Sequence, residues 1–146
     1  MLYLPHIHGK YNIAAGWGSP GERTVMAESQ SEALAAVKAH VEAFNADDLD
    51  AVVAGFAEDA VFANGDQLIV GRRGIGALFG QALGQVQATL DLRGTVTEGE
   101  SVACELTERV TIGGQTFEFD LAGFFTVRGG LIRRAKIYRE GAAEGA

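Results

Sequence analysis

Residues 101–127 read SVACELTERVTIGGQTFEFDLAGFFTV, two strand-like segments joined by a pair of glycines. Gly113 and Gly114 suit the positive backbone φ angles that a two-residue hairpin turn requires. Such a turn fixes the register of the two strands, because it places Ile112 opposite Gln115 and sets every pair beyond them. The sequence therefore predicts an antiparallel hairpin whose two faces can be identified residue by residue.

One face of this hairpin is apolar except for a single carboxylate. Its members are Cys104, Leu106, Glu108, Val110, Phe117, Phe119 and Leu121. The opposite face is polar and holds Glu105, Thr107, Arg109, Thr111, Glu118 and Asp120. A slip of one residue would exchange the faces and turn Arg109 inward in place of Glu108. Because the turn and the pattern agree, we expect Glu108 to face the interior.

The hairpin is the middle of a longer run of strands. Segments 89–97 and 131–139 are also rich in β-branched and aromatic residues, and short turn sequences at 98–100 and 129–130 separate them from the hairpin. This order predicts an antiparallel meander.

Three helices are predicted before the meander, at 29–44, 47–56 and 75–86, with short strands at 60–63 and 67–70. Ser29 and Glu32 have the spacing of a capping box at the start of the first helix. Gly76, Gly80 and Gly84 recur at four-residue steps in the third, which indicates either a close contact with the sheet or a helix loose enough to move. Three helices must then fold across one sheet face to bury it.

Composition limits the classes of partner. The chain has 146 residues, a formal net charge of −7 and one cysteine, Cys104, so we expect one domain without an internal disulfide. An acidic protein does not suit nucleic acid or an anionic membrane surface. Pro5, His6, His8 and Lys10 interrupt any apolar run at the N-terminus, which argues against a secretory signal. We therefore expect a cytoplasmic protein.

The chain divides into three predicted parts: an extension at 1–30, one domain at 31–140 and a tail at 141–146. The extension holds both prolines and lacks periodicity, so it is predicted to be loosely held. The alternative is an ordered arm anchored by residues such as Leu2 and Trp17. The pair His6 and His8 lacks a third ligand nearby in sequence, so no metal and no cofactor are expected.

The segment HVEAFNADDLDAVVAGFAEDAVFANG at 40–65 and the three C-terminal strands carry a resemblance to a known family. Over residues 31–140 the chain resembles the SnoaL-like and ketosteroid isomerase branch of the nuclear-transport-factor-two-like superfamily. The resemblance implies an α+β fold, a cone-shaped roll in which a curved, mixed, mainly antiparallel sheet wraps around three N-terminal helices. It also implies that the roll encloses an apolar pocket.

The resemblance places three positions of ketosteroid isomerases on this chain. In those enzymes an Asp base works beside an oxyanion hole made of a Tyr and a protonated Asp. The Tyr position falls on His40, the base position on Asn64 and the second Asp position on Gly123. An amide cannot accept and return a proton at neutral pH, so the usual steroid isomerase route is not expected.

Limonene epoxide hydrolases are a second comparison, through the segment LTERVTI. They carry an Arg followed by an Asp two residues later, where this chain has Arg109 and Thr111. Their other Asp falls near Ile137, while Asn64 matches a water-binding Asn. SnoaL-type cyclases use a His and an Asp around the last strand, where this chain has Ala135 and Ile137. The acidic positions of both reactions are absent.

The candidate polar groups of the pocket are His40, Asn64 and Glu108. His40 lies on the inward edge of the first helix; the alternative is a core-edge histidine with one satisfied hydrogen bond. Glu108 is costly on an apolar face unless it is paired, and the alternative is that it reaches solvent near the sheet edge. Asn64 is also a strong turn residue before Gly65. The predicted apolar lining is Phe44, Phe62, Leu106, Val110, Phe119, Leu121 and Ile137.

Two functions follow from this pocket. The first is a cofactor-independent acid–base enzyme, of isomerase, cyclase or hydrolase type, in which His40, Asn64 and Glu108 act on a small apolar oxygenated molecule. The second is a non-catalytic ligand-binding or dimerisation module. We expect a homodimer that pairs through the outward sheet face. That face carries Arg109, Glu118, Asp120, Phe124, Thr126, Arg134, Lys136 and Tyr138.

Overall fold

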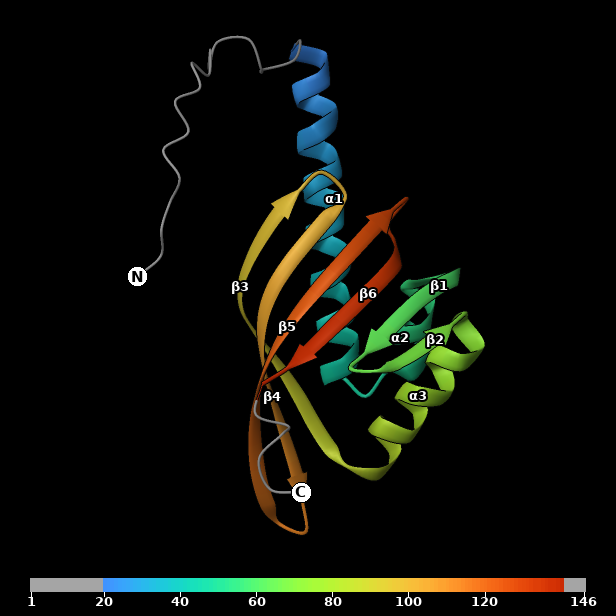
Figure 1. Ribbon diagram of the computed structural model, residues 1–146, viewed down its shortest axis with the longest axis vertical. Coiled ribbons are helices and arrows are strands. Elements are labelled where there is room, and N and C mark those ends of the chain that lie inside the picture. Colours follow the sequence, from blue (N-terminus) through green and yellow to red (C-terminus); the bar gives the residue numbers. More distant parts are fainter. Residues whose placement is uncertain (1–19, 141–146) are drawn as a thin grey trace.

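A computed structural model describes residues 20–140, which form an α+β fold with one mixed, six-stranded sheet (Figure 1). The helices are α1 (Pro20–Asn45), α2 (Leu49–Ala54) and α3 (Arg72–Gln85). The strands are β1 (Phe56–Asn64), β2 (Gln67–Val70), β3 (Gln87–Glu98), β4 (Ser101–Ile112), β5 (Gln115–Arg128) and β6 (Leu131–Arg139). The strand order is β2-β1-β6-β5-β4-β3, and only β1 and β6 pair in parallel.

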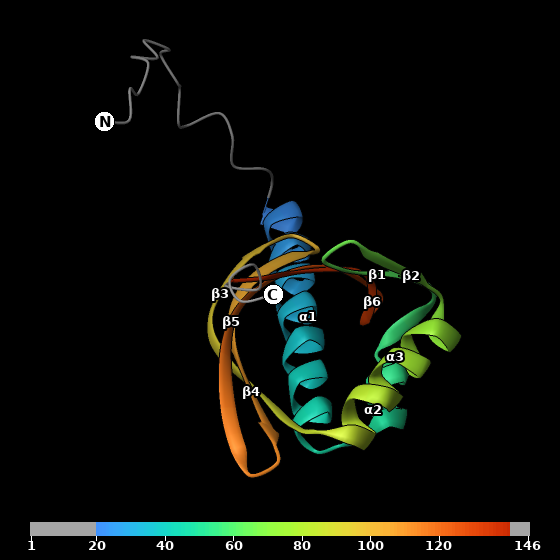
Figure 2. The ribbon, with the colours of Figure 1, turned by 60° about the horizontal axis from the view of Figure 1, so that its bottom comes forward.

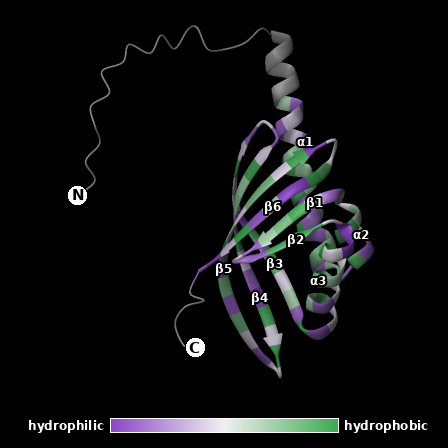
Figure 3. Ribbon diagram, turned by 45° about the vertical axis from the view of Figure 1, so that its right-hand side comes forward, coloured by the Kyte–Doolittle hydropathy of each residue, from purple (hydrophilic) through white to green (hydrophobic). Residues whose placement is uncertain are grey.

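The register predicted for the β4–β5 hairpin is confirmed. Gly113 and Gly114 have φ angles of 60° and 81°, the positive values that the turn requires. Ile112 lies opposite Gln115, and the pairing continues without a shift along the whole hairpin. Figure 3 shows the resulting alternation of hydrophilic and hydrophobic residues along the strands.

The sheet curves around α1 without closing, so β2 and β3 remain its edges (Figure 2). Helix α1 packs against β3, β4, β5 and β6, and its buried stripe includes Val37 and Phe44. At the end of α1, Asn45 makes two hydrogen bonds to the backbone of edge strand β3. Its Nδ2 donates to the Leu90 carbonyl at 2.8 Å, and its Oδ1 accepts from the Leu90 amide at 2.7 Å. This clamp holds the edge of the sheet to the helix.

Two of the three glycines at four-residue steps in α3, Gly76 and Gly80, lie against α2 rather than against the sheet. A Cβ at Gly76 would lie 3.3 Å from Val53 Cγ2, and one at Gly80 would lie 3.5 Å from Leu49 Cδ2. Gly84 has open space around it. The predicted close contact is therefore present for two of the three glycines, with a different partner.

All three helices differ from the prediction at their boundaries, and the start of α1 and the end of α2 change the assignment of residues. Helix α1 begins at Pro20 and not at Ser29, because residues 22–28 are mostly good helix formers but lack the apolar periodicity that would reveal a helix. Phe56, predicted in the stripe of the second helix, is instead the fully buried first residue of β1. Gly55 caps α2 six residues after it begins, and Phe56 pairs with Ile132.

Some predictions fall on residues 1–19 and 141–146, which lie outside the described part of the chain. They include the tail, most of the extension, the alternative anchor Trp17, and the pair His6 and His8. No helix within residues 20–140 is long and apolar enough to cross a membrane. The expected cytoplasmic location and the expected absence of a cofactor stay predictions.

Candidate functional site

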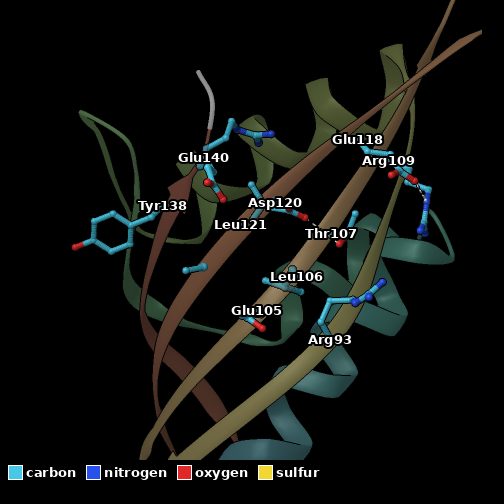
Figure 4. A pocket seen from close by; sticks show the side chains of 12 residues that line it. Arg93, Glu105, Leu106, Thr107, Arg109, Glu118, Asp120, Leu121, Tyr138 and Glu140 are labelled. Carbon is cyan, nitrogen blue, oxygen red and sulfur yellow. Dashed lines mark hydrogen bonds and ion pairs between the residues drawn. The ribbon is translucent and has the colours of Figure 1, made fainter. Parts of the chain in front are cut away.

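Within the described residues, hollows lie on both sides of the sheet, two on the outer face and one on the inner face. The larger outer one, about 620 Å³, is lined by charged and polar side chains such as Glu105, Thr107 and Asp120 (Figure 4). The inner one, about 170 Å³, lies between the sheet and helices α1 and α3 and is mostly apolar. We take the inner cavity as the candidate site, because an apolar cavity with a few convergent polar groups is the usual form of a small-molecule site.

The three predicted polar residues come together at this inner cavity. His40 reaches it from α1, Asn64 from the end of β1 and Glu108 from β4. Six of the seven predicted apolar residues also line it: Phe44, Phe62, Leu106, Val110, Leu121 and Ile137. Phe119 does not line it. The lining residues that the sequence did not indicate are Val41, Leu78, Phe79, Ala82, Val86, Ala88, Leu90, Phe125 and Arg139.

His40 is a buried, neutral imidazole. Only 7% of the residue is exposed, and its ring meets the edges or faces of Phe56 and Phe79 at centroid distances of 5.4 and 5.6 Å. Burial lowers the pKa of His40 from 6.5 to about 4. Its Nδ1 has no hydrogen-bond partner among the described residues. A buried nitrogen without a partner is costly.

Glu108 faces inward, as the turn predicted, and is paired. Arg139 Nη1 donates a hydrogen bond to Glu108 Oε2 at 2.5 Å, and the two side chains are 31% and 15% exposed. The Arg139 guanidinium also lies 5.2 Å from the centroid of the Phe119 ring. Phe119 therefore packs against Arg139 instead of lining the cavity. Arg139 follows Ile137 by two residues in β6, so strand alternation already placed it on the inward face. That signal was available in the sequence.

Asn64 lies beside the last strand. It pairs with Ile137 of β6 in the sheet register and with Gln67 of β2 across the turn. Lys136 Nζ donates a hydrogen bond to the Gly65 carbonyl at 3.0 Å, so the turn is tied to β6. The Asn64 amide is thereby held at the cavity on a supported turn.

A phenylalanine fills the space at Gly123, the position that matches the second acid of ketosteroid isomerases. A Cβ at Gly123 would lie 2.7 Å from Phe125 Cε2 and 3.2 Å from Cys104 Sγ. The Phe125 ring is buried and its centroid lies 6.1 Å from that of His40. No side chain fits at Gly123 while Phe125 packs in this way.

Arg109 and Thr111, the positions that match the epoxide hydrolase strand, do not reach the cavity. Arg109 Nε donates to Glu118 Oε1 at 2.6 Å on the outer face (Figure 4). The Thr111 and Thr116 hydroxyl oxygens lie 3.0 Å apart in a hydrogen bond. The arginine of the inner cavity is Arg139, from a different strand.

The remaining reactive groups offer no second site. Burial raises the pKa of the Cys104 thiol from 9.0 to about 11, so at neutral pH it stays a protonated, unreactive side chain. Residues 20–140 contain no group of three or more His, Cys, Asp or Glu side chains placed to hold a metal ion.

Comparison with known proteins agrees with this fold. The SnoaL-like domain family matches residues 37–135. An M. tuberculosis LEH-like epoxide hydrolase is 29% identical, with a TM-score of 0.71 over 76% of this chain and 84% of its own. A candidate polyketide cyclase from Xanthomonas campestris is also 29% identical, with a TM-score of 0.65 over 75% and 91%.

A protein with a ketosteroid isomerase-like fold from Catenulispora acidiphila is 19% identical, with a TM-score of 0.66 over 70% of this chain and 83% of its own. At that identity the likeness concerns the fold alone. No curated protein sequence matches this chain significantly.

The buried imidazole predicts a pH-dependent stability. The unfolded chain binds a proton at His40 below pH 6.5, whereas the folded chain binds it only near pH 4. Stability contributed by neutral His40 is therefore complete above pH 6.5 and is lost as pH falls toward 4, by about 2 kcal/mol between pH 6.5 and 5. Urea unfolding of the wild type and of His40→Phe across this range measures the difference. Parallel pH dependences in the two proteins would contradict the burial of a neutral imidazole.

Proposed function

This chain belongs to the SnoaL-like domain family, and from that premise we propose that its inner cavity binds one small apolar molecule carrying an oxygen function. The observation that carries the proposal is His40, buried at the wall of an apolar cavity with its Nδ1 unpartnered. Apolar walls favour an apolar ligand, and the unpartnered nitrogen favours one with a hydrogen-bonding group.

The size of the cavity limits the ligand. Drug-sized molecules occupy pockets of about 300–1,000 Å³, and an apolar cavity of about 150 Å³ is known to bind benzene. The inner cavity, at about 170 Å³, therefore suits a single ring with a small substituent. A fused steroid-like ring system exceeds it.

Acid–base catalysis is the first candidate role for this site. Glu108 is the one carboxylate among the residues that line the cavity, so it is the group to accept a proton from a bound molecule. Neutral His40 and the Asn64 amide would donate hydrogen bonds to the ligand oxygen, where negative charge develops as the proton leaves. The similarity to an epoxide hydrolase and a candidate polyketide cyclase supports an enzyme of this fold.

Non-catalytic binding is the second candidate, and one observation favours it. Glu108 already accepts a hydrogen bond from Arg139, so one of its carboxylate oxygens is occupied and is not free for a bound molecule. The two positions that would hold acids in ketosteroid isomerases are Asn64 and Gly123. A pocket without those two acids can still bind a small apolar molecule, but it lacks the groups that the ketosteroid isomerase reaction uses.

We also propose that two copies of the chain pair through the outer face of the sheet. Phe124 and Tyr138 are 52% and 55% exposed there and contact each other with ring centroids 5.9 Å apart. Val96 of β3 is 73% exposed. Exposed aromatic residues on a mixed surface are typical of protein interfaces.

The charges of this face suit a two-fold pairing. Arg134 and Lys136 lie opposite Thr126 and Phe124, whereas Asp120 lies toward the other end of β5. A two-fold axis through the aromatic centre would place the basic end of one copy against the acidic end of the other.

Binding is tested by filling the cavity. Ala82 lines it from α3, whereas Ala77 of the same helix is exposed on the surface. With benzyl alcohol as the probe, we expect Ala82→Phe to weaken binding at least tenfold, because the new ring occupies the ligand's space. Ala77→Phe should change it less than twofold, as measured by calorimetry. Equal affinities for the two variants would place the probe outside the cavity.

Catalysis is tested by substituting two glutamates that each pair with an arginine. Glu108 lines the cavity, and Glu118 lies outside it on the outer face. We expect the wild type to exchange α-protons of cyclohexanone with D₂O, followed by NMR, because Glu108 abstracts them. Glu108→Gln should lose this exchange, since an amide cannot accept the proton. Glu118→Gln, on the outer face, should keep it. Binding of cyclohexanone without exchange in the wild type would select the non-catalytic role.

Pairing through the sheet is tested by adding charge to its centre. We expect light scattering at micromolar concentration to give twice the chain mass for the wild type and the single mass for Phe124→Arg, which sits beside Lys136. The control is Leu68→Arg on β2, 67% exposed in the wild type, which should stay a dimer. A monomer mass for the wild type would contradict the proposal.

A further inference from the structure

Three neighbouring strands each contribute one side chain to a cluster beside the apolar cavity: two charged groups and the aromatic ring between them. Glu108 comes from β4, Phe119 from β5 and Arg139 from β6, and Glu108 and Phe119 are directly opposed. Arg139 crosses the Phe119 ring, with its guanidinium carbon 5.2 Å from the ring centroid, to reach the Glu108 carboxylate. The Arg139 and Glu108 side chains are 31% and 15% exposed, whereas His40 is buried. This cluster therefore lies toward the open end of the cavity.

The ion pair leaves bonding capacity on both partners. A guanidinium has five N–H donors, and within the described residues Arg139 uses one of them, to Glu108 Oε2. Glu108 Oε1 accepts no hydrogen bond from residues 20–140. A molecule at the open end of the cavity therefore meets one donor group and one acceptor group, whose charges cancel each other.

We infer that Glu108 and Arg139 make the cavity selective for neutral ligands over charged ones. The inference rests on the proposed ligand-binding function of the same cavity. A bound carboxylate that approached Arg139 would lie beside the Glu108 carboxylate, and a bound ammonium that approached Glu108 would lie beside the Arg139 guanidinium. Like charges a few ångströms apart repel each other, and the partial burial of the Glu108 side chain, 15% exposed, limits how far water screens them. A neutral hydroxyl or carbonyl oxygen can accept from Arg139 without meeting this repulsion.

The Glu108 carboxylate therefore occupies the place that an anionic ligand would take on Arg139. Replacing it by the isosteric amide removes the repulsion and leaves the partly exposed Arg139 guanidinium free to form charge-assisted hydrogen bonds to a carboxylate. Replacing Arg139 leaves the opposite charge. The two single substitutions are thus expected to change the charge preference of the cavity in opposite directions, one in favour of anionic ligands and the other in favour of cationic ligands.

The test uses three single-ring probes of similar size: benzyl alcohol, benzoate and benzylamine at pH 7, with affinities from calorimetry. The wild type should bind benzyl alcohol at least tenfold more tightly than either charged probe. Glu108→Gln should bind benzoate at least tenfold more tightly than the wild type does, while its affinity for benzyl alcohol stays within threefold. Arg139→Gln should bind benzylamine more tightly by a similar factor. Glu118→Gln, on the outer face, should keep the wild-type order.

The outcomes separate this inference from the proposed function. If benzyl alcohol does not bind the wild type, the ligand-binding function fails and the inference with it. If benzyl alcohol binds but Glu108→Gln gains no affinity for benzoate, the proposed ligand-binding function is supported and charge selection by Glu108 is overturned. Arg139→Gln leaves an unpaired carboxylate, so thermal unfolding of each variant is measured first. If Arg139→Gln does not fold, the double variant Glu108→Gln/Arg139→Gln replaces it and should lose the gain in benzoate affinity shown by Glu108→Gln.

Discussion

The turn at Gly113 and Gly114 fixes which face of the long hairpin is turned toward α1. Both glycines take positive φ angles, and every pair along the hairpin keeps the resulting register. Leu106 and Leu121 are buried only in this register, so a slip of one residue would expose them and bury charges. The inward position of Glu108 is a consequence of the same constraint. The cost of placing a carboxylate there is offset by Arg139.

The packing around Gly123 shapes one wall of the cavity, which Phe125 lines. Gly123 has no side chain, so the Phe125 ring leans over it and contacts His40. Aromatic rings then surround an imidazole that burial keeps neutral. Asn45 holds the edge strand to α1 and maintains the width of the space. His40 Nδ1 is left without a hydrogen-bond partner among the described residues, and this is the observation behind the proposed ligand.

The sequence was sufficient for the antiparallel meander and insufficient for the parallel pairing of β1 with β6, for the helix ends and for one site residue. Strand alternation and paired glycines are local signals, and they predicted β4, β6 and the register between β4 and β5. The start of α1 at Pro20 has no apolar periodicity to show it, and Phe56 continues a helical pattern that Gly55 ends. Arg139 shares the face of Ile137, but its pairing with Glu108 spans three strands and depends on how the sheet curves. Nothing local in sequence encodes that contact.

The polar chemistry of this pocket has a different location from that of the enzymes it resembles. The acid positions of ketosteroid isomerases are an amide at Asn64 and a ring-filled gap at Gly123. The carboxylate that the cavity does contain is Glu108, at the open end and held by an arginine from the last strand. The same fold accommodates many activities because its walls are positioned by the sheet while the polar groups vary. In this protein a buried histidine lines the cavity, and an ion pair between β4 and β6 lies beside it.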